Sequence, residues 1–298
     1  MGDWGMGRLG GWQNVYEAWF FGCPVHFEPG QVPATTPILT SRNKRSIFAV
    51  DITRPLERDP FRRSIEFAER MRERARGLAY RDRPVEVTAT PPLGSDGPLT
   101  VAVNLRGSEF LSDLVEDPAY ADELMGFLTE AAILRAKAIT ALWGIQRQEI
   151  GLADDMIEAI GVRTYIERVL PHHRRYYDAL DPERRMRRTM HLCGDACRHF
   201  PIIAAECGVS SFDTGFPLDF AAVHRAVGPS VEILGGVEVA TLLHGAPEAV
   251  FARAQSILTS GVLEGERFIL REANNLPPCV PMENLAAMYR AAQEYGCY

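Results

Sequence analysis

The chain has 298 residues, a length typical of a single α/β barrel domain. Its 32 basic and 39 acidic residues give a net charge of -7, which argues against a general nucleic-acid-binding protein. Hydrophobic residues make up 46% of the chain, enough for a sizeable core. No apolar run approaches the ~18 residues that a membrane span needs, so we expect no membrane partner.

Six cysteines are scattered along the chain without the spacing of a disulfide framework. The first residues have neither the basic start nor the apolar run of a signal peptide. We therefore expect a cytoplasmic protein whose thiols are reduced.

Residues 1–60 form an irregular N-terminal part of the expected domain. This part is rich in glycine over residues 5–11 and in proline over residues 29–37. Its single apolar run, residues 47–52, predicts a short strand. No linker or repeat divides the chain, so residues 1–298 are predicted to form one domain.

Beyond this part, short apolar runs typical of strands alternate with helical periodicity. Strands are predicted over residues 85–90, 148–153, 189–193, 210–214, 231–235 and 268–272. Helices are predicted over residues 119–143, 164–180, 220–227, 247–260 and 283–295. This alternation favours an α/β fold, a (β/α)8 TIM barrel around a parallel sheet. With residues 47–52 these make seven predicted strands, one fewer than the eight of such a barrel. An irregular or missing first strand is therefore expected.

His191 and Cys193 lie two residues apart at the end of one predicted strand. Alternate residues of a strand point the same way, so the imidazole and the thiol can converge on one atom. Both groups are suitable ligands for zinc. The alternative is a buried histidine and a small apolar cysteine in the interior of a barrel.

Carboxylates also lie at or just after the C-terminal ends of the predicted strands, where parallel barrels carry their active sites. Asp154, Asp155 and Asp213 are candidate catalytic residues that orient a polar group of the substrate, although an aspartate after a strand is also a common helix N-cap. Asp195 is expected either to accept a hydrogen bond from His191 or to cap the next helix. His173 lies in a helix rich in arginine and tyrosine and is expected to be solvated.

Four further residues lie at or just after the ends of the last two predicted strands. Gly235 and Gly236 are expected to permit a tight turn or the close approach of a ligand. Together with Glu272 and Asn274 they are the candidate substrate-binding residues.

Four sequence runs occur in a fixed order along the chain: HLCGD at 191–195, FDTG at 212–215, LGGVEVATLL at 234–243 and PPCVPMENLAAM at 277–288. Together they resemble the uroporphyrinogen decarboxylase superfamily, and most closely its corrinoid-linked methyltransferase branch. The resemblance extends over roughly residues 20–298. It implies a (β/α)8 barrel with its site at the C-terminal ends of the strands.

The methyltransferase branch also implies a metal site. In that branch the His-x-Cys pair, here His191 and Cys193, joins a later cysteine to hold zinc, and a corrinoid protein supplies or accepts the methyl group. The position of the later cysteine is filled by Asn274, a poor zinc ligand. Cys279 is the expected substitute; an oxygen of Glu272 or Asp213, or no metal at all, are the alternatives.

The expected function is therefore that of a methyltransferase acting between a small methylated compound and a corrinoid protein or thiol, with zinc as its cofactor. Two alternatives stay open: a metal-free decarboxylase or lyase of the same superfamily, and a non-catalytic barrel that acts as a binding partner. An arginine-containing N-terminal segment that binds tetrapyrrole propionates is not recognisable, which argues against tetrapyrrole decarboxylation. A homodimer is expected by analogy with the superfamily.

Overall fold

The computed structural model describes residues 4–6, 15–29, 32–87 and 93–297. The chain divides into two compact units, residues 1–147 and 148–298, which are described one at a time. The single domain over residues 1–298 stays a prediction. Among the described residues, no helix combines the length and the apolar character needed to cross a membrane.

The first unit is mainly helical and carries two small sheets. Its α-helices are α1 Tyr16–Phe20, α2 Phe61–Ala75, α3 Pro98–Arg106, α4 Glu109–Glu116 and α5 Pro118–Trp143. One sheet has the order β1 Trp4–Met6, β5 Arg83–Val87, β4 Ala79–Tyr80, and the other pairs β2 Val25–His26 with β3 Ala34–Thr35. The predicted strand at 85–90 thus corresponds to β5, and its residues 88–90 lie outside the described residues.

The strand predicted over residues 47–52 is wrong. Lys44–Ala49 form a 3₁₀ helix, η1, and a second short one, η2, covers Pro55–Glu57. Only Ile47 of the first of these is buried. A half-buried strand of six residues would bury about every second side chain, and here one is buried. The apolar run in the sequence did not show which of its side chains are buried.

A buried ion pair joins α1 and α5 in the first unit. Arg135 of α5 donates to the carboxylate of Glu17 in α1, and both side chains are almost fully buried. The Ser95 hydroxyl donates to the same carboxylate, and the guanidinium lies over the rings of Tyr16 and Phe61. Because an unpaired charge is costly inside a protein, these contacts fix α1 and α5 relative to each other.

The second unit contains a five-stranded, entirely parallel sheet. Its strands are β6 Glu149–Ala153, β7 Arg187–Leu192, β8 Ser211–Thr214, β9 Glu232–Glu238 and β10 Phe268–Ala273, in the spatial order β10-β9-β8-β7-β6. All five predicted strands of this region are confirmed, with ends that agree within three residues. The chain therefore has an α/β fold with a parallel sheet.

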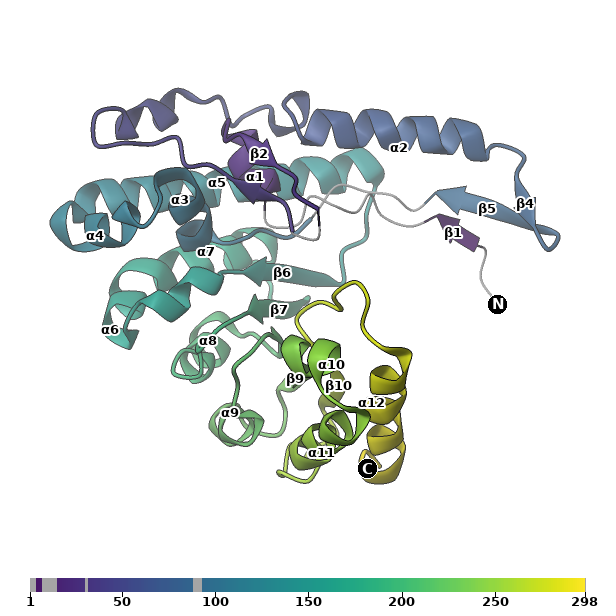
Figure 1. The fold of residues 1–298 in the computed structure, drawn as a ribbon. Coiled ribbons are helices and arrows are strands. Elements are labelled where there is room, and N and C mark those ends of the chain that lie inside the picture. Colours follow the sequence, from purple (N-terminus) through teal and green to yellow (C-terminus); the bar gives the residue numbers. More distant parts are fainter. Residues whose placement is uncertain (1–3, 7–14, 30–31, 88–92, 298) are drawn as a thin grey trace. The chain divides into compact units, whose positions relative to one another are not determined.

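The helices of the second unit follow the strands along the chain. They are α6 Val162–Thr164, α7 Leu170–Leu180, α8 Phe200–Cys207, α9 Phe220–Val227, α10 Val239–His244, α11 Pro247–Leu258 and α12 Met282–Tyr295, with a 3₁₀ helix η3 at Asp155–Ala159 and a π-helical stretch η4 at Tyr165–Val169. Each strand neighbours the next one in sequence, and parallel crossovers are right-handed, so the connecting helices gather on one face of the sheet. Figure 1 shows α7, α8, α9 and α11 along that side.

The two faces of this sheet differ in chemistry. Ile150, Met190, Phe212 and Ile233 are almost fully buried and alternate with more exposed residues along their strands. The helices cover this apolar face. The alternate positions of β7 and β8 include His191 and Asp213, so polar side chains project from the opposite face.

Gly236 in β9 gives a test of this packing. A Cβ at Gly236 would lie 2.0 Å from the backbone oxygen of Arg271, whereas a Cβ at Gly161 would meet nothing within 4 Å. Because backbone cannot easily move aside, we expect Gly236→Ala to lower the free energy of unfolding by about 2–3 kcal/mol. Gly161→Ala should change it by less than about 1 kcal/mol. Urea denaturation measures both, and equal effects would contradict the packing described.

Candidate functional site

The candidate site begins as a row of side chains across three strands. Ala153 of β6 is the register partner of His191 of β7, which is in turn the partner of Asp213 of β8. Partners in a parallel sheet project from the same face, and the row lies at the C-terminal ends of the strands. The residues that follow these ends therefore meet around His191.

Asp155, His191 and Cys193 are the group that the structure brings together. His191 Nε2 lies 3.1 Å from Cys193 Sγ and 3.9 Å from Asp155 Oδ1. Each residue offers one ligand atom, and the three atoms lie within 4.8 Å of one another. A tetrahedral zinc ion holds N, O and S ligands about 3.4–3.6 Å apart, so the three side chains could bind it after small adjustments.

The loops that carry this group are joined by hydrogen bonds. The Cys193 N–H donates to Asp155 Oδ1 over 2.7 Å, and the Asp195 N–H donates to Glu158 Oε2 over 3.1 Å. Between them, Gly194 has a φ of +72°, and a Cβ there would lie 1.5 Å from the Glu158 carboxylate. The positive φ of Gly194 favours a glycine in this turn, whereas the exposed Glu158 side chain could move aside for a Cβ.

A second layer of contacts holds the imidazole. His191 Nδ1 lies 3.1 Å from Asp213 Oδ2, and Asp213 Oδ1 accepts a hydrogen bond of 3.0 Å from Arg271. A carboxylate on the outer ring nitrogen leaves the other nitrogen directed at a metal, a common arrangement around ligating histidines. Of the two alternatives for Asp195, the hydrogen bond with His191 is wrong, because Asp213 takes that place.

The electrostatics of the group follow from these contacts. Burial lowers the pKa of His191, but the hydrogen bonds to Asp213 and Cys193 and the nearby carboxylate of Asp155 outweigh it and raise the pKa to about 10. Burial raises the pKa of Asp155, opposed by the charge of His191. A metal ion would therefore have to displace a proton from the ring nitrogen.

The adjacent aspartates, Asp154 and Asp155, have different surroundings. The Asp154 side chain is fully buried and lies 2.8 Å from His173 Nε2, whose Nδ1 is 3.1 Å from the Tyr165 hydroxyl. Asp155 is partly exposed and faces His191. Asp154 thus connects β6 to η4 and α7, and His173, expected to be solvated, is fully buried.

The other predicted residues lie around this group or away from it. Cys279 is exposed in the segment before α12 and is not among the three grouped residues. Glu272 accepts a hydrogen bond from Arg271, and the backbone oxygen of Asn274 accepts another. The roles of Cys279 as a metal ligand and of Glu272 and Asn274 as substrate contacts stay predictions. The third side chain that the structure places beside His191 and Cys193 is that of Asp155.

Gly235 and Gly236 lie within β9, which is longer than predicted. A Cβ at Gly235 would lie 2.2 Å from Thr214 Oγ1, and one at Gly236 would strike the backbone of Arg271. Close packing within the protein accounts for both glycines without a ligand.

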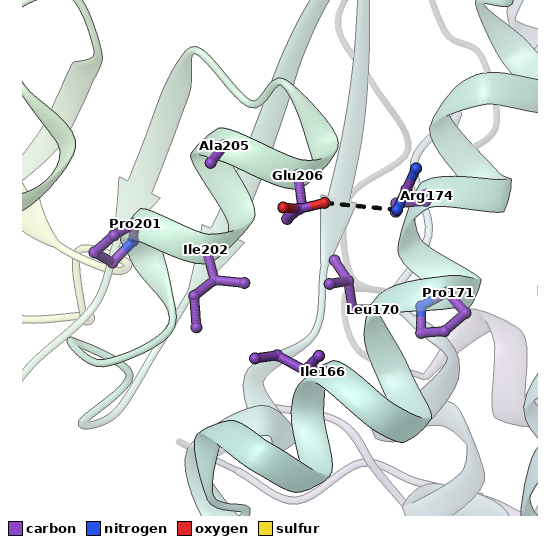
Figure 2. Close-up of a pocket in the computed structure, with 8 residues that line it drawn as sticks. All are labelled: Ile166, Leu170, Pro171, Arg174, Pro201, Ile202, Ala205 and Glu206. Carbon is purple, nitrogen blue, oxygen red and sulfur yellow. Dashed lines mark ion pairs between the residues drawn. The ribbon is translucent and has the colours of Figure 1, made fainter.

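A cavity of about 730 Å³ lies elsewhere in the second unit, between η4, α7 and α8 (Figure 2). Most of its lining is apolar and includes Ile166, Leu170, Pro201 and Ile202. Its charged lining residues, Arg174 and Glu206, approach to 3.5 Å, and both side chains are about half exposed. Glu206 is the one carboxylate in this lining and it is paired with Arg174, and the lining holds no histidine or cysteine, so the cavity lacks a ligand group like the one around His191.

The contrast between the two aspartates can be tested. Asp154→Ala would leave His173 and Tyr165 without the buried carboxylate, so we expect a loss of about 2–4 kcal/mol in the free energy of unfolding. Asp155→Ala, at a partly exposed position, should cost less than about 1 kcal/mol. Urea denaturation of the two variants is the measurement. If Asp155→Ala proves the more destabilising, the assignment of Asp154 to the core is mistaken.

The chain is similar to known proteins in both fold and sequence family. One similar solved structure is a methyltransferase from Methanosarcina mazei, with 18% identity, a TM-score of 0.70, and coverage of 95% of this chain and 78% of that chain. At this identity the likeness shows a shared fold. The search of curated proteins found no match. The family described as uroporphyrinogen decarboxylase matches residues 13–295, and the chain belongs to this family.

Proposed function

We propose that the protein is a methyltransferase that moves a methyl group between a small methylated compound and a corrinoid protein or thiol, with a zinc ion held by Asp155, His191 and Cys193. The observation that carries the proposal is the convergence of these three side chains, with Asp213 behind the imidazole. The shared fold with the Methanosarcina mazei methyltransferase supports it.

The ligand set fits zinc in kind, charge and number. A thiolate, an imidazole and a carboxylate are the side chains that zinc proteins use. The thiolate and the carboxylate together carry two negative charges, which balance a divalent cation. Three protein ligands leave a fourth position for a substrate, as catalytic zinc sites do. Bound there, zinc would stabilise a substrate thiolate or polarise a methyl donor.

The residues of this chain perform the remaining tasks. His191 lies in β7 and Cys193 in the turn that follows it, whereas Asp155 lies just after the end of β6. The substrate would therefore approach from the side of β8 to β10. Asp213 holds the imidazole in place, and Glu272 and Asn274 lie next to Arg271 as candidate contacts for the substrate.

The five consecutive parallel strands, with the site at their C-terminal ends, fit a (β/α)8 barrel whose first strand is irregular or missing. The corrinoid protein and the homodimer are predictions from the resemblance.

Zinc content tests the metal site. We expect about one zinc per chain in the untagged wild-type protein and none in Cys193→Ala, because the thiolate is the strongest of the three ligands. Cys279→Ala is the matched control: it removes an exposed thiol outside the group and should retain the metal. Elemental analysis after dialysis gives the values. If Cys279→Ala lost zinc instead, the third ligand would be Cys279, in the loop after β10, and not Asp155.

Methyl transfer tests the reaction. With methylcobalamin and a small thiol, the zinc-loaded enzyme should transfer the methyl group, with a change in corrinoid absorbance, and His191→Ala should lose at least about 100-fold in rate. Turnover of a carboxylic acid after complete chelation, without methyl transfer, would contradict the proposal and favour a metal-free decarboxylase or lyase. No activity together with no binding of either compound would favour a binding protein.

A further inference from the structure

Arg271 of β10 connects three parts of the second unit. Its guanidinium donates to Asp213 Oδ1 over 3.0 Å, to Glu272 Oε1 over 2.8 Å and to the backbone oxygen of Asn274 over 2.7 Å. Asp213 in turn lies against His191 Nδ1. A continuous series of contacts therefore runs from the loop after β10 to the imidazole of β7.

The geometry of β9 makes this series possible. In the sheet, β9 lies between β10 and β8. The Arg271 side chain must therefore cross β9 to reach Asp213, because the backbones of β10 and β8 are about 10 Å apart. The register partner of Arg271 in β9 is Gly236. A side chain at Gly236 would collide with the Arg271 backbone, so the glycine permits the close approach of β10.

Stability alone gives a weak reason for these contacts. The side chains of Arg271 and Asp213 are 29% and 36% exposed, and ion pairs at such positions contribute little to folding. Their geometry has a clearer consequence for His191. With one oxygen held by Arg271, the Asp213 carboxylate presents its other oxygen to the ring nitrogen and cannot rotate away.

We infer that Arg271 is a positioning residue: through Asp213 it fixes the orientation of His191 and directs Nε2 at Asp155 and Cys193. This inference rests on the proposed function, because it assigns Arg271 a role in the affinity of the proposed zinc site. It also makes the loop after β10 part of that site, since the same guanidinium holds the backbone of Asn274.

The test compares Arg271→Met with Arg253→Met in the full chain. Arg253 makes a similar, partly exposed ion pair with Glu238 at the end of β9, and within the part of the chain that the structure describes its hydrogen bonds go to Glu238 alone, not to Asp213 or His191. Both variants should unfold close to the wild-type midpoint. In a competition with a chromophoric chelator, Arg271→Met should bind zinc 10- to 100-fold more weakly than wild type, and Arg253→Met should bind it as wild type does.

A second readout follows the ring itself in the metal-free protein. Nitrogen NMR of ¹⁵N-histidine-labelled protein should show a His191 Nδ1–H protected by Asp213, identified by its absence in His191→Gln. Arg271→Met should abolish that protection, and Arg253→Met should keep it. If Arg271→Met leaves the signal intact, the positioning role is overturned. If wild type binds no zinc but only Arg271→Met loses the signal, the positioning role holds and the zinc proposal fails.

Discussion

The register of three parallel strands is the constraint on which the site depends. It aligns Ala153, His191 and Asp213 in one row and projects the last two from the face opposite the helices. A shift of β7 by one residue would turn His191 into the apolar layer and bring Met190 to the site. The buried alternation of the strands therefore fixes the chemistry as well as the core. The same row puts Asp213 against the ring nitrogen that faces away from Cys193.

The third partner of the His-x-Cys pair follows β6, the first strand of the sheet in sequence, and not β10, the last. The resemblance places that partner after the last strand, where this chain has Asn274, while the structure supplies Asp155 after β6. Exchange of a thiolate for a carboxylate keeps the charge of the ligand set but gives zinc a harder and weaker donor. A bound ion would then withdraw more electron density from a substrate in the fourth position. The loop after β10 keeps a part in the site through Arg271.

Prediction from sequence succeeded where local pattern decides the outcome. The strands of the second unit and the proximity of His191 to Cys193 follow from apolar alternation, and both are found in the structure. It failed where long-range contacts decide. Asp154 and Asp155 are equivalent as neighbours in sequence, yet one is buried against His173. Arg271 carried no local signal, because its role depends on a reach across β9. Its pairing with carboxylates from two strands is visible only in three dimensions.

The central claim is that Asp155, His191 and Cys193 form one zinc shell. Zinc X-ray absorption spectroscopy of the loaded wild-type protein tests it most directly, because sulfur and the lighter ligands scatter differently. The account predicts one sulfur at about 2.3 Å and the remaining ligands, nitrogen and oxygen, at about 2.0–2.2 Å. In a sample free of added thiol, two sulfurs in the shell would contradict it, since a second cysteine would then be a ligand, and a shell without sulfur would exclude Cys193 as a ligand.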